Sequence, residues 1–391
     1  MEKENISTFI EGNKERFIKL SKKIWGNPEL GHQEFKASEW LSDELAESGF
    51  EVERGIAGLE TAFSAVYTSN KPGPTLAYLS EYDALPIGHA CGHNLIGVMS
   101  LAAGIALKDA ADEFGGKIVV MGTPAEETTG GKAIIAEHGY FDDVDAAMMV
   151  HPSQSHLRSG TSNTLEALQF DFSGKNAHAA SKPEEGINAL DAAILTFNNI
   201  NALRQHTTND SKIHGIITRG GDVPNVTPDH TQAKFYVRTK SIDTLGALVE
   251  KVKNCAEAAA LATGCKLNIS NYESRFMDLI TNQTLSQVYT DNLLLFDVKE
   301  TEIREKKGGG GSTDMGNVSH KVPAIHPYIK IPNSPYSHHT AEFRDAAGSN
   351  EGMKALILGA KVLAYSGYDI LKDSNLLSKM KDEFNKQNQA E

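Results

Sequence analysis

The sequence predicts an α/β protein in which helices flank a largely parallel central sheet, with a smaller α+β unit inserted into it. Three observations favour this class. The chain has 391 residues, more than one compact core usually holds. Apolar runs alternate with helical patterns in its first third, and between residues 166 and 275 the order of patterns becomes β-α-β-β-α-β. We therefore expect one domain from residues 1–165 and 276–391, and an inserted domain from residues 166–275.

The first third of the chain supplies helices and buried strands. Residues 4–24 and 35–48 carry apolar side chains at helical spacing, and Gly49 follows the second segment as a C-cap. Helix-like segments separate three short apolar runs, which are TLAYLS (75–80), KIVVMG (117–122) and AAMMV (146–150). Uninterrupted apolar strands are typical of a parallel sheet that is covered on both faces.

The middle of the chain has a different rhythm. Its patterns are a strand (ALQFDFSG), a helix (GINALDAAILTFNNINALRQ), two strands (KIHGIITRG and QAKFYVRT), a helix (TLGALVEKVKNCAEAAALATG) and a strand (CKLNISNY). This order is the ferredoxin-like arrangement. Helical and strand patterns then resume, and the elements that they predict need an outer layer to pack on. The unit is therefore predicted to be an insertion into the larger domain.

Composition excludes several classes of protein. A formal net charge of -13 argues against nucleic-acid binding, which rests on clustered Lys and Arg. No apolar run approaches the roughly 20 residues that span a bilayer, and the N-terminus lacks a secretory signal. Only three cysteines occur, Cys91, Cys255 and Cys265, which fits a reducing compartment. We expect a cytoplasmic protein whose partners are small molecules.

Metal-compatible or acidic residues follow each predicted strand of the larger domain. The late strand-like segment AIHPYIKI (324–331) leads to a pair of histidines in the same way. Ligands of open α/β sheets bind at the carboxyl ends of the strands, so we expect these residues to meet at one sheet edge. They are Glu81, Asp83, Cys91, His93, Glu126, Glu127, His151, His338 and His339.

The stretch GHACGHN (88–94) places Cys91 two residues before His93. Thiolate and imidazole together suit zinc or a similar transition metal, and the flanking glycines let the backbone bend so that both side chains aim at one point. A structural thiol and a cysteine nucleophile paired with a neighbouring histidine are the alternatives. The CxxC pairs of a structural zinc site are absent from the sequence.

The adjacent carboxylates Glu126 and Glu127 admit two interpretations. Neighbouring side chains of an extended segment diverge, so one carboxylate can bind a metal while the other reaches a bound water. Alternatively, they form a solvated acidic pair at the start of a helix. His151 taken alone would be a hydrogen-bonded structural residue.

Seven motifs taken together resemble the aminoacylase and glutamate carboxypeptidase family of metallopeptidases. In order they are SEYDALP, GHACGHN, GTPAEE, MMVHP, FSGKNAHAA, NVTPD and SHHTAEF, and the resemblance runs from about residue 20 to residue 365. The chain looks similar to the amidohydrolase branch, which includes auxin-conjugate hydrolases, aminobenzoyl-glutamate hydrolase and aminoacylase-like dipeptidases. CGHN in place of the commoner CGHD, together with HTAEF, points to the last two.

The resemblance implies a catalytic domain from residues 1–165 and 276–391 that holds one or two divalent cations. Zinc is the expected metal, with manganese and cobalt as alternatives. The inserted domain, residues 166–275, would be a lid that also forms a homodimer interface. The implied metal ligands are Cys91, His93, Glu127, His151 and His339, because the downstream TAEF favours His339 over His338.

Further roles follow from the same resemblance. Glu126 would be the general base, and Asp83 the aspartate beside the metal centre. The lid residue His178 would act in catalysis by helping to hold the substrate carbonyl. The substrate would also contact Asn225 of the lid and the loop Gly311–Asp314, including Ser312. Many relatives have a histidine where this chain has Glu81, and a bridging aspartate in the region of Cys91 and His93.

The expected function is therefore metal-dependent hydrolysis of an amide or peptide bond in a small substrate, with Glu126 taking a proton from the attacking water. The candidate substrates are N-acyl amino acids, dipeptides and aminobenzoyl-glutamate. A hydrolase that uses Cys91 as a nucleophile and a non-catalytic small-molecule-binding protein are the alternatives.

Overall fold

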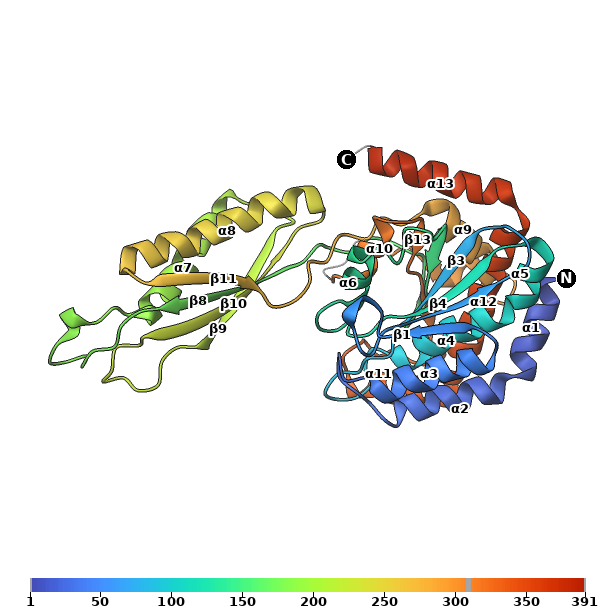
Figure 1. Cartoon of the computed structure of the whole chain (residues 1–391), viewed down its shortest axis with the longest axis horizontal. Coiled ribbons are helices and arrows are strands. Elements are labelled where there is room, and N and C mark those ends of the chain that lie inside the picture. Colours follow the sequence, from blue (N-terminus) through green and yellow to red (C-terminus); the bar gives the residue numbers. More distant parts are fainter. Residues whose placement is uncertain (1, 307–310, 390–391) are drawn as a thin grey trace. The chain divides into compact units, whose positions relative to one another are not determined.

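The computed structural model describes residues 2–306 and 311–389 and divides into two compact units. Unit 1 consists of Met1–Thr161 and Leu279–Glu391, and unit 2 of Ser162–Asp278 (Figure 1). Residues 166–275, the segment expected to be inserted, lie inside unit 2. All the implied metal ligands belong to unit 1.

Unit 1 is built on a six-stranded sheet with the strand order β1-β2-β4-β3-β5-β13. The sheet begins with the antiparallel strands β1 (Glu51–Arg54) and β2 (Phe63–Thr68), and β2 also pairs antiparallel with β4. The rest of the sheet is parallel and consists of β4 (Lys117–Gly122), β3 (Thr75–Ser80), β5 (Ala146–Met148) and β13 (Ala324–Ile325). The predicted largely parallel sheet is confirmed.

Both faces of the parallel part of this sheet are buried, which explains why the central positions of β3 and β4 are all apolar. Leu76 and Tyr78 of β3 belong to one hydrophobic core, and the alternate residues Ala77 and Leu79 to a second core on the opposite face. The first core includes α4 (His93–Ala106) and α12 (Asn350–Lys372). The other helices of unit 1 are α1 (Lys3–Gly12), α2 (Lys14–Trp25), α3 (Phe35–Glu47), α5 (Lys108–Phe114), α6 (Gly131–Glu137), α9 (Gln283–Leu294), α10 (Met315–Ser319), α11 (Ala341–Gly348) and α13 (Ser374–Gln389).

The segment His93–Phe114 has the length and hydropathy of a membrane-spanning helix, although 89% of its most apolar window is buried inside the protein. It contains α4, which is buried along its whole length against α12 and the sheet. A helix surrounded by protein needs apolar residues on all sides, so its composition follows from its place in the core.

Two sequence expectations need correction. The helix expected over residues 4–24 is divided at Asn13, whose non-helical backbone ends α1 and whose side-chain amide donates to the carbonyl of Phe9. The strand expected over residues 324–331 is also divided, because His326 and Pro327 separate β13 from β14 (Tyr328–Lys330). Proline has no N–H to continue a sheet ladder.

This second division moves part of the site to another sheet. Strand β14 belongs to a small sheet with the order β12-β7-β14-β6, not to the six-stranded sheet. Its other strands are β12 (Ile303–Arg304), β7 (His156–Leu157) and β6 (His151–Ser153). His151 follows β5 of the six-stranded sheet and opens β6 of the small sheet, so it lies where the two sheets meet. The expectation of a single sheet is wrong for the late strand, because the strand that leads to His338 and His339 is β14 of the small sheet.

Unit 2 has the ferredoxin-like order that the sequence predicts. Its elements are β8 (Glu166–Ser173), α7 (Ala189–Leu203), β9 (Lys212–Arg219), β10 (His230–Arg238), α8 (Ile242–Thr263) and β11 (Lys266–Asn271). The strands pair antiparallel in the order β11-β8-β10-β9. Along β10 every second residue is buried, and these residues pack against α7 and α8.

The close contact of α12 with β3 gives a stability prediction. A methyl group at Gly367 would meet the buried hydroxyl of Tyr78. Overpacking lowers the free energy of unfolding by about 1–3 kcal/mol, whereas the better helix propensity of alanine raises it by about 1 kcal/mol. We expect Gly367→Ala to lower the free energy of unfolding, and to lower it less in a Tyr78→Phe background, as measured by denaturant unfolding.

Gly246 in α8 is the matched control, because a Cβ there meets nothing within 4 Å. Gly246→Ala should leave stability unchanged or raise it. Equal effects of Gly367→Ala with and without the Tyr78 hydroxyl would contradict the assigned contact.

Candidate metal centre

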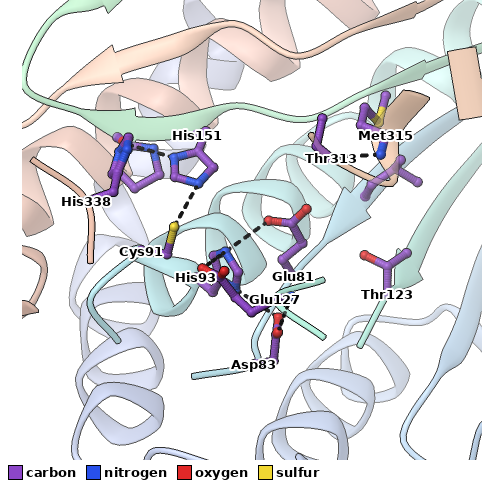
Figure 2. A network of polar contacts seen from close by, with 12 residues as sticks. Glu81, Asp83, Cys91, His93, Thr123, Glu127, His151, Thr313, Met315 and His338 are labelled. Atoms are coloured by element: carbon purple, nitrogen blue, oxygen red, sulfur yellow. Dashed lines mark hydrogen bonds and ion pairs between the residues drawn. The ribbon is translucent and has the colours of Figure 1, made fainter. Parts of the chain in front are cut away.

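Side chains with metal-binding groups gather in unit 1 around Cys91 (Figure 2). Four overlapping groups have their ligand atoms within 4.8 Å of one another. Cys91, His93, Glu126 and Glu127 each belong to two of them, so the four groups form one continuous cluster. The groups are Cys91, His93 and His151; Cys91, Glu127 and His339; His93, Glu126 and Glu127; and Glu81, Glu126 and Asp314.

Two glycines shape the turn that carries Cys91. Gly88 and Gly92 have φ values of 98° and 80°, in the left-handed region that favours glycine. A Cβ at Gly92 would also lie 2.5 Å from Pro152, so no larger residue fits without a shift. Gly92 is the N-cap of α4, and His93 is the first residue of that helix. The turn therefore places the thiol and the imidazole at the helix N-terminus.

The carboxylate of Asp83 orients two neighbours of this turn. Its Oδ1 lies 2.8 Å from Nδ1 of His93, and its Oδ2 accepts a hydrogen bond from the backbone N–H of Glu127 at 2.9 Å. Because an ionised carboxylate only accepts, Nδ1 of His93 donates to Asp83, which leaves Nε2 as the nitrogen that binds a metal when the ring is neutral. Nε2 is buried, 3.4 Å from Oε2 of Glu81 and 3.9 Å from Oε1 of Glu127.

His151 is held in the same tautomer by a different acceptor. Its Nδ1 donates to the carbonyl of Pro152 at 2.7 Å, which leaves Nε2 3.6 Å from the sulfur of Cys91. A metal-binding histidine usually donates its other N–H to a carboxylate or carbonyl in this way. His151 and His93 thus present their free nitrogens to the centre.

The geometry favours His339 over His338. Nε2 of His339 lies 3.5 Å from the sulfur of Cys91 and 3.3 Å from Oε1 of Glu127. His338 instead donates from Nε2 to the carbonyl of Pro152 at 2.9 Å, and its ring packs edge-on against Phe343. The left-handed backbone of His339, with φ of 65°, separates the directions of the two adjacent side chains.

The negative charges of the centre raise the pKa of two neighbouring groups, Cys91 and His93. Burial and the charge of Glu127 raise the pKa of the Cys91 thiol well above its usual range. Burial would lower the pKa of His93, but the charges of Asp83 and Glu81 raise it well above its usual range. A thiol with a raised pKa is a poor nucleophile, because the thiolate is the reactive form.

The donor set fits a divalent transition metal. Oε1 of Glu127 and Nε2 of His93 are buried and make no hydrogen bond of good geometry; they lie 3.3 Å from Nε2 of His339 and 3.4 Å from Oε2 of Glu81, respectively. A cation between them would satisfy both atoms. Thiolate, imidazole and carboxylate together suit zinc and its neighbours in the first transition row. The part of the chain that the structure describes thus places a thiol, three histidines and a carboxylate where such an ion would bind.

Glu126 differs from Glu127 in its surroundings. Burial and the charges of Glu81 and Glu127 raise the pKa of Glu126 well above its usual range. For Glu127, burial acts in the same direction, but contact with His339 and the charge of His93 bring its pKa below the usual range. The pair is therefore divided into a group that can hold a proton and a group that stays ionised.

Sequence analysis missed Lys132, which lies in α6 and is fully buried. Its Nζ is 2.5 Å from Oε1 of Glu81 and 2.6 Å from Oδ1 of Asp314. The other oxygen of Asp314 accepts from the backbone N–H of Lys132 at 2.9 Å. The positive charge of Lys132 thus compensates the negative charges of Glu81 and Asp314, which lie beside Glu126. In the sequence, this role is indicated only by the position of a lysine within a short, mostly apolar helix.

The remaining expected site residues are not joined to this cluster by the contacts above. Gly311 is exposed and Ser312 half-buried, in the segment that leads to α10. His178 and Asn225 are exposed in unit 2, where the N–H of Ala179 donates to the carbonyl of Asn225 at 3.0 Å. Contact of these four residues with substrate stays a prediction.

Comparison with known proteins agrees with these features. Residues 163–264 match a peptidase dimerisation domain. The chain is 38% identical to the Xaa-Arg dipeptidase of Mus musculus, over 96% of this chain and 90% of the mouse protein. It is 27% identical to a component of the p-aminobenzoyl-glutamate hydrolase of Escherichia coli, over 97% and 94% of the two chains.

Solved structures share the fold. An aminobenzoyl-glutamate utilization protein from Klebsiella pneumoniae matches with a TM-score of 0.77 and 18% identity, over 93% of this chain and 98% of that one. A dinuclear metal-binding peptidase from Bacillus subtilis matches with a TM-score of 0.69 and 18% identity, over 93% and 99%. The fold of this chain is thus shared with these two proteins.

The orienting role of Asp83 gives a prediction for metal affinity. In Asp83→Asn the amide group can accept only one of the two hydrogen bonds, so either His93 or Glu127 loses its orientation. We expect the affinity for zinc to fall about 10–100-fold, as measured by titration against a chromophoric chelator. The exposed Asp143 is the control, since Asp143→Asn changes the same formal charge away from the site. Equal zinc affinities of the two variants would argue against this role.

Proposed function

The chain belongs to the M20 family of metal-dependent amidohydrolases and peptidases, and on this premise we propose that it is a dipeptidase that removes a cationic C-terminal amino acid such as arginine. The reaction class is shown by its relatives, so the protein is a metal-dependent amidohydrolase that acts on small substrates. The choice of dipeptide rests on the 38% identity to an Xaa-Arg dipeptidase across 96% of the chain. The relative named for p-aminobenzoyl-glutamate is 27% identical, which makes that amide the second candidate.

We propose zinc as the metal, with manganese and cobalt as alternatives, and Cys91, His93, Glu127, His151 and His339 as its ligands. The observation that carries the proposal is the convergence of these side chains, with Nε2 of His93 and Oε1 of Glu127 buried 3.9 Å apart. A bound divalent cation supplies a water of lowered pKa and polarises the carbonyl of the amide.

Glu126 has the surroundings of a general base. Its carboxylate belongs to two of the groups, one with His93 and Glu127 and the other with Glu81 and Asp314. It therefore lies between the implied metal ligands and the other buried carboxylates. The raised pKa lets it accept the proton of the attacking water and hold it until the amine leaves. His178 would meet the substrate carbonyl, and Asn225, Gly311 and Ser312 would line the pocket.

We also propose that the chain forms a homodimer through unit 2 and works in the cytoplasm. The matched dimerisation domain supports the first point, as does the edge strand β9, where Ile216 is 64% exposed and Ile217 38% exposed. The second point rests on three free cysteines, one of which belongs to the metal centre.

A substrate panel tests the proposed function. Zinc-loaded protein should hydrolyse Ala-Arg and Ala-Lys faster than Ala-Glu, acetyl-alanine or p-aminobenzoyl-glutamate, and a chelator should abolish turnover. Ninhydrin detection of the released amino acid measures each rate. Turnover that resists chelators but stops on alkylation of Cys91 would support a cysteine nucleophile, and binding without turnover would support a non-catalytic protein.

The assignment of Glu126 makes a separate prediction. Glu126→Gln keeps the shape of the side chain but cannot take a proton, so kcat should fall at least about 100-fold while bound zinc per chain stays unchanged. Zinc content is measured by atomic emission on the same samples. Glu137→Gln, at an exposed position of α6, is the control. Loss of both zinc and activity would place Glu126 among the metal ligands instead.

A further inference from the structure

The residue that precedes Glu126 has a backbone conformation that few residues other than glycine adopt. Ala125 has φ of 60°, in the left-handed region, and its side chain is fully buried. Its carbonyl accepts hydrogen bonds from the backbone N–H groups of Thr128 and Gly130 at 3.3 and 2.9 Å. A residue keeps such a conformation only where its surroundings hold it, and these positions gather at functional sites. Contacts from other segments are therefore needed to keep Ala125 in place.

The buried carboxyl group of Glu34 supplies one such contact. Its Oε1 accepts a hydrogen bond from the backbone N–H of Ala125 at 2.8 Å, and its Oε2 accepts one from the hydroxyl of Thr61 at 3.0 Å. Burial and the charge of Asp83 raise the pKa of Glu34 to about 7. Glu34 is 0% exposed, so it is shielded from substrate and acts only on the protein around it.

Buried carboxyl groups hold the backbone on both sides of Glu126. The N–H of Ala125, before it, donates to Glu34, and the N–H of Glu127, after it, donates to Asp83 at 2.9 Å. These two contacts fix the backbone from which the side chain of Glu126 projects. A general base must lie within hydrogen-bond reach of the water that it deprotonates, and a displacement of about 1 Å can lower a rate about 100-fold.

The segment that carries Glu34, residues 29–34, is itself fixed to both loops of the metal centre. The carbonyl of Glu29 accepts from the N–H of Ala84, in the loop after β3, at 2.8 Å. A Cβ at Gly31 would lie 2.4 Å from Oγ1 of Thr128, so the segment closely contacts the loop after β4. The carboxylate of Glu29 accepts from backbone N–H groups in the first turn of α3. The segment thus connects α3 to the two loops.

We propose that Glu34 is a positioning residue of the catalytic site, which holds Ala125 in its left-handed conformation and so directs Glu126 toward the attacking water and Glu127 toward the metal. This inference rests on the proposed hydrolysis and on the role of Glu126 in it. It gives a function in unit 1 to residues 29–34, which lie outside the seven motifs of the sequence.

The test compares Glu34→Ala with the conservative variant Glu34→Gln. The side-chain carbonyl of glutamine can still accept from the N–H of Ala125, whereas alanine removes this acceptor. With Ala-Arg and saturating zinc, Glu34→Ala should lower kcat about 10–100-fold and change KM less than about twofold, whereas Glu34→Gln should stay within about threefold of the wild type. Glu39→Ala, at an exposed position of α3, is the matched control and should change neither constant.

A substitution at Ala125 separates positioning from a general loss of structure. Glycine adopts the left-handed conformation without the steric cost that alanine meets, so Ala125→Gly should raise the kcat of Glu34→Ala at least about threefold. A defect in the packing of α3 would not be repaired at this position. Gly31→Ala crowds the same loop and should also lower kcat, which provides the test if Glu34→Ala does not fold.

Thermal melting shows whether each variant is folded, and titration against a chromophoric chelator gives its affinity for zinc. Because the loop also carries Glu127, the zinc affinity of Glu34→Ala should fall about 10-fold and recover in part with Ala125→Gly. A wild-type kcat in Glu34→Ala, or a loss that Ala125→Gly does not relieve, would overturn the positioning role. If the wild-type protein cleaves none of the substrates, the proposed function fails, and an unchanged zinc affinity of Glu34→Ala would then overturn the inference separately.

Discussion

The carboxylate of Asp83 is the interaction on which the metal centre depends. One oxygen holds His93 and the other holds the backbone of Glu127, so a single buried group fixes the direction of two implied ligands. This contact is possible because β3 and β4 run parallel and end together, with Ser80 opposite Gly122. The loops that follow the two strands then meet, and the register of the sheet sets the geometry of the site.

The centre also depends on how its negative charge is balanced. Glu81, Glu126 and Asp314 come within one group, and the buried Lys132 pairs with the first and last of them. Glu126 is left without such a pair, and its pKa rises, whereas histidines surround Glu127 and lower its pKa. Two adjacent residues of the same type thus acquire different chemistry from their surroundings alone.

Much of the fold was predictable because burial on both faces leaves a direct record in the sequence. The central positions of the strands at 75–80 and 117–122 are all apolar, and the β-α-β-β-α-β order of patterns in unit 2 matches its observed elements. The segment 324–331 was predicted less well, since its apolar pattern does not reveal that Pro327 transfers the chain to another sheet. Short strands divided by one proline look continuous in a pattern that records only hydrophobicity.

The sequence by itself determined the residue types of the site and their order after the strands, because metal ligands are few and stand where strands end. Only the tertiary structure decided how these residues divide into roles. It pairs Lys132 with Glu81 and Asp314, turns His338 away from the centre, and brings Lys306 to Tyr328, which lies 22 positions along the chain. These relations join residues from separate elements, and local patterns carry no information about which distant groups share one buried space.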